Sequence, residues 1–211
     1  MSQAQSANEI TVVSDYVCPF CYLGRQSLED YQDEREEELE INWHPFDLRA
    51  GKRTQDGEIK EDVDDGKDEQ YYEQARQNVR RLQEEYDVDM AMELVDDVDS
   101  LNAQIASLYV KEHYSQAEWL EFDEAVFDAL WQDERDIGDV DVLAAIAEDV
   151  GLDGDEVRSA VDDDAMRERV ETLFAEAKRG GISGVPTFIY DGRAASGALP
   201  PEQLERLVES D

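Results

Sequence analysis

Residues 14–24 read SDYVCPFCYLG and contain the only two cysteines of the chain, Cys18 and Cys21. The segment before them, residues 9–14 (EITVVS), is short and rich in β-branched side chains, which predicts a buried strand. Pro19 suits the first turn of a helix, and apolar residues continue after it at helical spacing. The two cysteines are therefore predicted to lie where a strand passes into a helix.

The spacing of the cysteines bears on whether they have a structural, metal-binding or redox role. A disulfide between residues three positions apart closes a very small loop and contributes little to stability. Zinc needs three or four ligands, whereas the only two histidines, His44 and His113, are far apart and lack ligand spacing. We therefore expect no metal and interpret the cysteines as a reversible dithiol.

Position along the helix separates the two thiols. Cys18 lies at the predicted helix start, where unpaired N–H groups and the helix dipole favour the thiolate. Cys21 lies one turn further in, so we expect it to be more buried and less acidic. It then suits the resolving role, in which a second thiol attacks a mixed disulfide.

The rest of the chain alternates between strand and helix patterns, without internal repeats or low-complexity linkers. A long central block carries apolar and aromatic stripes at helical spacing, which we interpret as core. The order is β-α-β, helices, β-β-α. After the first helix the predicted elements are a strand at 39–46 (LEINWHPF), a polar loop at 50–66, the helical block ending at Gly180–Gly181, a strand at 186–190 (PTFIY), a turn at Asp191–Gly192 and a helix from 201 to about 208.

Several motifs occur together in one order: SDYVCPFCYLG, WHPFDLRAG, AVFDALWQDERDIGDVDVLAAIAEDVGLD, GVPTFIYDG and SGALP. With these motifs the chain resembles the DsbA-like branch of the thioredoxin superfamily, and within it the FrnE-like subgroup. The resemblance spans nearly the whole chain. It implies an α/β, thioredoxin-like fold with an inserted all-helical domain. The thioredoxin-like domain would comprise residues 1–65 and 181–211, and the inserted helical domain residues 66–180.

The resemblance also implies the composition of the site. Pro186 would follow a cis peptide bond and face the cysteines, and Val185 would offer its backbone to an extended substrate segment. Tyr16 and Phe20, with Pro19, flank the cysteines, and we expect them to form an apolar rim for a peptide. The implied activity is thiol–disulfide exchange by the redox-active Cys18–Cys21 pair, without a further cofactor, on protein, peptide or small thiols.

Two departures from related families bear on the activity. DsbA has a histidine between its cysteines where this chain has Phe20. We therefore expect the direction of exchange to depend on the thiol pool that the protein meets. The related 2-hydroxychromene-2-carboxylate isomerases and kappa-class glutathione transferases use glutathione and typically have serine in place of the nucleophilic cysteine. A glutathione-dependent enzyme of that kind is the alternative activity. A non-catalytic acidic interaction protein on the same scaffold is the alternative of another class.

The charge is strongly negative, with 19 Lys and Arg against 55 Asp and Glu and a net charge of −36. Such a balance argues against nucleic acid or anionic membranes as partners. Only five of the cations are lysine, and acidic, lysine-poor surfaces resemble those of proteins from extreme halophiles. The sequence shows neither a secretory signal nor a membrane span, so we expect a cytoplasmic protein. It makes no prediction of the oligomeric state.

Three further polar residues have alternative interpretations. His44 lies on the opposite face of its strand from the apolar residues, and we expect it to be solvated rather than near the redox site. His113, near a helix end, is predicted to be a surface or capping residue. Arg25 is predicted to pair with Glu29 at i+4 rather than to contact the site.

Overall fold

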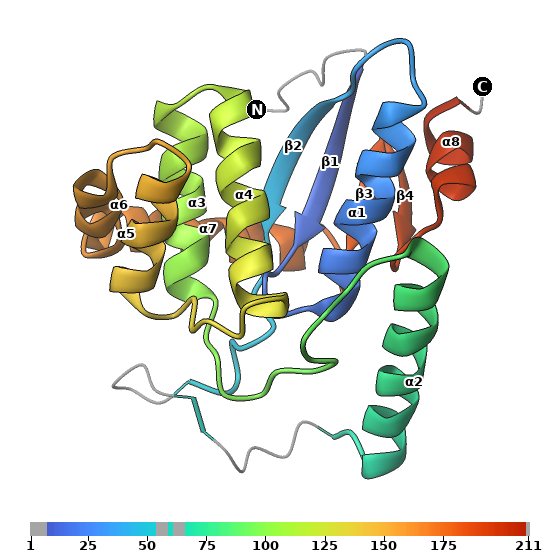
Figure 1. Ribbon diagram of the computed structural model, residues 1–211, viewed down its shortest axis with the longest axis horizontal. Coiled ribbons are helices and arrows are strands. Elements are labelled where there is room, and N and C mark those ends of the chain that lie inside the picture. Colours follow the sequence, from blue (N-terminus) through green and yellow to red (C-terminus); the bar gives the residue numbers. More distant parts are fainter. Residues whose placement is uncertain (1–7, 54–58, 61–65, 210–211) are drawn as a thin grey trace.

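The computed structural model (Figure 1) describes residues 8–53, 59–60 and 66–209. Within these ranges the chain forms four strands and eight helices. Much of the predicted loop at 50–66 lies outside the described residues, as do residues 1–7. The elements are, in chain order, β1 (Glu9–Ser14), α1 (Pro19–Asp33), β2 (Glu40–Pro45), α2 (Glu69–Tyr86), α3 (Leu101–His113), α4 (Gln116–Trp131), α5 (Val140–Asp149), α6 (Gly154–Val161), α7 (Asp164–Arg179), β3 (Thr187–Tyr190), β4 (Arg193–Ser196) and α8 (Pro201–Glu209).

The sheet has the order β2-β1-β3-β4. β1 runs parallel to β2 and antiparallel to β3, so that Val12 lies between Trp43 and Phe188. The β3–β4 hairpin turns at Asp191 and Gly192, whose φ angles are 47° and 73°. Two positive φ values are what a two-residue hairpin turn of type I′ requires, and the Asp-Gly pair provides them. The predicted β-α-β and β-β-α units are confirmed.

Helices cover both faces of this sheet. On one face, α1 and α8 pack over Ile10 and Phe188, both fully buried. On the other face, Ala177 of α7 packs with Val13 of β1 and with Phe46, just beyond β2. Because side chains alternate along a strand, β1 supplies apolar side chains to both layers. The strand that leads to Cys18 is thereby fixed from both sides.

Helices α3 to α6 form a lobe, seen in Figure 1 with α3 and α4 beside the sheet and α5 and α6 outside them. The aromatic stripes predicted as core are buried there: Trp119, Phe122 and Trp131 are 0–2% exposed. α2 instead packs against α1 through Val79, Leu82 and Leu23. An α/β fold with inserted helices is confirmed, whereas the domain limits at 65/66 and 180/181 stay predictions.

Candidate functional site

Cys18 is the N-cap residue of α1, as predicted. Its backbone is extended (φ −98°, ψ 114°), and its carbonyl accepts hydrogen bonds from the N–H of Cys21 at 3.0 Å and of Tyr22 at 3.3 Å. Pro19 occupies the first turn, which has no acidic residue. A helix N-terminus carries about half a positive charge, and no carboxylate of this turn opposes it. The role of Cys18 as the attacking thiol stays a prediction that rests on this placement.

The GVPTF segment lies directly against Cys18, although 167 residues separate Cys18 from Val185. The peptide bond between Val185 and Pro186 is cis, and the Cys18 Sγ atom lies 3.6 Å from the Val185 carbonyl oxygen. Pro186 also packs on α1 at Gly24, where a Cβ atom would lie 3.2 Å from the Pro186 Cγ atom. The structure therefore brings the CPFC segment and the GVPTF segment together at Cys18.

The two thiols differ in burial in the predicted order. Cys18 is 6% exposed and Cys21 only 2%. Burial raises the pKa of the Cys21 thiol well above its ordinary value, and the hydrogen bond and charge of Cys18 raise it further. Cys21 therefore holds its proton more firmly than a free cysteine does.

Cys18 opens onto a groove of about 480 Å³, which we call the Cys18 groove. Pro19, Phe20 and Val185 line it, as predicted. Its other walls come from segments that the sequence analysis did not associate with the site. These are the loop after β2, the first half of α2 with Lys67 just before it, and the segment before α3. They contribute Leu48, Arg49, Lys52, Lys67, Tyr71, Tyr72, Ala75, Leu94, Val95 and Asp96.

The prediction that Tyr16 lines a peptide rim is wrong. Tyr16 is 1% exposed, its ring packs on Phe127 with centroids 4.6 Å apart, and its hydroxyl donates to Asp123 Oδ1 at 2.7 Å. The Trp131 Nε1–H donates to the Tyr16 carbonyl at 2.8 Å. The chain between β1 and α1 thus passes beneath α4, which covers Tyr16.

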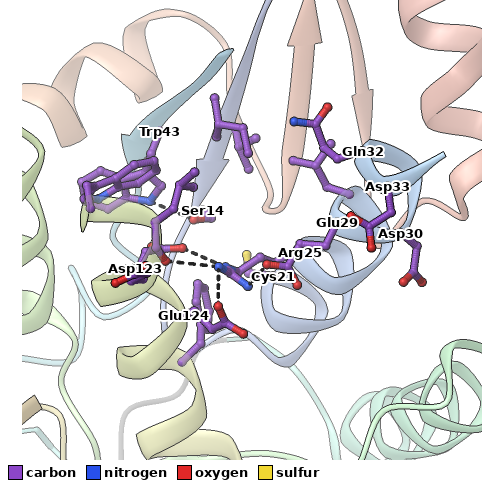
Figure 2. A pocket seen from close by; sticks show the side chains of 17 residues that line it. Ser14, Cys21, Arg25, Glu29, Asp30, Gln32, Asp33, Trp43, Asp123 and Glu124 are labelled. Atoms are coloured by element: carbon purple, nitrogen blue, oxygen red, sulfur yellow. Dashed lines mark hydrogen bonds and ion pairs between the residues drawn. The ribbon is translucent and has the colours of Figure 1, made fainter. Parts of the chain in front are cut away.

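A second cavity, of about 390 Å³, lies behind Cys21 between α1, α4 and the sheet (Figure 2). Arg25 points into it and pairs with Glu29 at 2.6 Å, as predicted. It also donates through Nε to Asp123 Oδ2 at 3.0 Å, which the sequence analysis did not anticipate. Arg25 does not line the Cys18 groove, although it shares the second cavity with Cys21.

Asp15 is a buried acidic group beside the cysteine motif, and the sequence analysis did not include it in the site. It is 0% exposed and accepts hydrogen bonds from the Leu48 N–H at 2.8 Å, the Val17 N–H at 3.3 Å and the Ser100 hydroxyl. Burial raises the pKa of Asp15 to about 6 against these hydrogen bonds, which lower it. Its backbone carbonyl accepts from the Cys18 N–H at 3.1 Å. Asp15 thus ties the cysteine motif to the loop after β2 and to α3.

The histidines lie away from the cysteines. His44 lies away from the redox site, as expected, but it is half-buried near α7 rather than fully solvated, and this burial lowers its pKa. Its Nδ1 atom lies 3.0 Å from the Pro45 carbonyl oxygen. His113 is exposed at the end of α3, with Nδ1 2.9 Å from the Tyr109 carbonyl oxygen, as predicted. Among the described residues, no three His, Cys, Asp or Glu side chains are grouped as metal ligands.

The fold and the site define a thioredoxin-like protein whose Cys-Pro-Phe-Cys motif faces a cis-proline. Residues 9–209 match the family model described as DSBA-like thioredoxin domain, and the chain belongs to this family. The predicted fold class is therefore confirmed. In the part of the chain that is described, no helix has the length and apolar character of a membrane span.

Known proteins resemble the chain over nearly its full length. It is 28% identical over 206 residues to the uncharacterized protein YwbO of Bacillus subtilis (strain 168), covering 96% of each chain. A probable DsbA oxidoreductase from Streptomyces coelicolor superposes with a TM-score of 0.76 at 22% identity, over 95% of this chain and 88% of the other. A 2-hydroxychromene-2-carboxylate isomerase superposes with a TM-score of 0.73 at 19% identity, over 94% and 92%. At these identities, the two structural likenesses show a shared fold.

Proposed function

We propose that this chain catalyses thiol–disulfide exchange, with Cys18 as the attacking thiol and Cys21 as the resolving thiol. The observation that carries the proposal is the placement of the Cys18 sulfur. It lies at the N-terminus of α1, opens onto the Cys18 groove and is 3.6 Å from the carbonyl oxygen that precedes the cis-proline. Membership of the DSBA-like family supports the same chemistry.

In the reducing direction, the Cys18 thiolate attacks one sulfur of a substrate disulfide. A Cys18–substrate disulfide forms, and the other substrate sulfur leaves as a thiolate and takes up a proton. Cys21 then loses its proton and attacks the Cys18 sulfur, which releases the second substrate thiol and leaves a Cys18–Cys21 disulfide. Two electrons pass from the dithiol to the substrate, and the reverse sequence oxidises a substrate dithiol. The pair needs no further cofactor.

The unequal burial of the two cysteines supports this division of roles. The raised pKa of Cys21 keeps it protonated while Cys18 reacts, so the two thiols do not compete for the substrate. Val185 lines the groove beside the attacking sulfur, and Pro186 follows it through the cis peptide bond. The proposed role of both residues is to orient the incoming disulfide. Protein, peptide or small thiols in the cytoplasm are the proposed partners.

Serine substitutions of the two cysteines test the proposal. Cys18→Ser should lower dithiol-dependent insulin reduction by about 10³-fold or more, because it removes the nucleophile. Cys21→Ser should keep the first step and accumulate a mixed disulfide, which mass spectrometry under non-reducing conditions detects. Normal turnover in either variant would contradict the assigned roles.

The same samples separate the alternatives. An isomerase related to the 2-hydroxychromene-2-carboxylate enzyme would act only with glutathione added and would not need Cys21. A non-catalytic interaction protein would show neither activity in the wild type. Either outcome would replace the proposed exchange reaction.

A further inference from the structure

The described lining of the Cys18 groove carries the opposite charge to the chain as a whole. Among the described residues that line it, the charged side chains are Arg49, Lys52, Lys67 and Asp96, three cations and one acid. The chain as a whole has 19 cations and 55 acids. Two of its five lysines therefore line the one groove onto which Cys18 opens, in a chain where acids outnumber cations almost threefold.

Arg49 places a fixed positive charge in this groove. It is 6% exposed, and its Nε and Nη2 atoms donate to the carbonyl oxygens of Val98 at 3.1 Å and Val95 at 2.6 Å. Carbonyl oxygens satisfy the N–H donors of a guanidinium without cancelling its charge. Arg53 provides a contrast a few residues on, because it pairs with the carboxylates of Asp47 and Asp99.

The two lysines line the groove around this fixed charge. The Lys67 Nζ atom lies 4.7 Å from the centroid of the Tyr71 ring, which also lines the groove. A cation–π contact holds an ammonium group in place and leaves its charge intact. Lys52 is half-buried in the loop after β2. A lysine ammonium has three N–H donors. Each of these two groups can therefore bind a substrate carboxylate in addition to a partner within the chain.

We propose that the Cys18 groove selects peptide substrates whose reactive cysteine is flanked by Asp or Glu. This inference rests on the proposed function and names its substrate class. The apolar part of the lining favours a peptide over a small thiol, because Phe20, Leu48 and Tyr71 offer surface to the side chains beside the reacting cysteine. Carboxylates on those neighbours would then meet Lys52 and Lys67.

The net charge of the molecule predicts the opposite preference. At long range, a chain of net charge −36 repels an acidic peptide and attracts a basic one. Charges in contact inside the groove are screened less by salt than charges a Debye length apart. A preference for acidic peptides would therefore be a property of the groove and not of the overall charge.

Three peptides test the inference. Each carries the same disulfide, with Glu, Gln or Lys on both sides of the reactive cysteine, and kcat/KM is measured for each at 0.15 M salt. The wild type should prefer the Glu peptide to the Gln peptide by about four- to 25-fold, because two exposed charge contacts contribute about two- to fivefold each. Lys52→Gln and Lys67→Gln should each lose about two- to fivefold on the Glu peptide and little on the Gln peptide.

Arg158→Gln is the matched control, because it removes the same charge on α6, outside the groove. It should leave the ranking of the three peptides unchanged. Equal rates on the Glu and Gln peptides, or an equal loss in Arg158→Gln, would overturn the inference. If Lys52→Gln and Lys67→Gln lowered kcat/KM on glutathione disulfide but not on the Glu peptide, that result would also overturn the inference. Failure to turn over even the Gln peptide would instead overturn the proposed exchange activity.

Discussion

At the scale of single residues, Asp15 makes the stability of the fold depend on pH. Its pKa is about 6 in the fold, against an ordinary value of 3.8, because burial disfavours the charged carboxylate. Between about pH 4 and pH 6 the folded state therefore binds more protons than the unfolded state, and stability falls as the pH rises. This group alone should lower the free energy of unfolding by up to about 3 kcal/mol across that window.

The Asp15→Asn variant tests this expectation through the slope of stability against pH. The variant should be less stable at every pH, because an amide offers one acceptor oxygen where the carboxylate offers two to Leu48 and Ser100. Urea unfolding should show that, as the pH rises from 4 to about 6, the free energy of unfolding falls more in the wild type than in the variant. Above that pH, where Asp15 is ionised in both states, the two curves should run parallel. Parallel curves throughout would contradict the prediction.

Single residues also show where local sequence patterns stop being informative. Cys18 and Pro19 were placed correctly, because a strand followed by proline marks a helix start within a few residues. Tyr16 was misplaced and the second partner of Arg25 was missed, because both side chains bond to Asp123, about a hundred residues away. No periodicity in the chain indicates that α4 covers the cysteine motif, so a residue beside the cysteines was taken for a rim residue.

At the scale of elements, the contact between α1 and the cis-proline segment depends on Gly24. A Cβ atom there would lie 3.2 Å from Pro186 Cγ and 3.3 Å from Phe188 Cζ. Both neighbours are buried, so neither can move away easily. Gly24→Ala should therefore destabilise the protein, since overpacking costs about 1–3 kcal/mol and the gain in helix propensity is only about 1 kcal/mol.

The same substitution should reduce disulfide exchange, because it moves Pro186 relative to Cys18. Thermal unfolding and insulin reduction measure the two effects. Gly51→Ala is the matched control, because its Cβ would meet no atom within 4 Å. A Gly24→Ala variant that gains stability and keeps wild-type turnover would show that α1 and the proline segment are not tightly coupled.

The elements themselves were largely predictable from sequence. β1 was placed at Glu9–Ser14 because its β-branched run is flanked by clear breaks, and the β3–β4 turn because Asp191–Gly192 suits positive φ angles. The walls of the Cys18 groove were not predictable. Lys52 lies in the loop after β2 and Lys67 just before α2, and their segments carry no apolar period that would place them beside Cys18.

At the scale of the whole molecule, the net charge of −36 is opposed by only 19 cations. At least nine arginines form ion pairs with carboxylates, most of them on the surface. Exposed ion pairs contribute about 0–1 kcal/mol each, and three dozen carboxylates remain in excess of the cations. Mutual repulsion among carboxylates therefore opposes folding wherever salt does not screen it.

Raising KCl from 0.1 M to 1 M should accordingly stabilise the fold, because the Debye length falls from about 10 Å to about 3 Å. The melting temperature should rise by about 2–4 °C for each kcal/mol of repulsion removed. Repeating the measurement at pH 4 provides the control, because carboxyl groups near their ordinary pKa of about 4 lose much of their charge there. A melting temperature that does not change with KCl would contradict the expectation of a salt-adapted protein. An equal rise in melting temperature at pH 4 would assign the stabilisation to the effect of salt on apolar surface, because few ionised carboxylates would remain there to be screened.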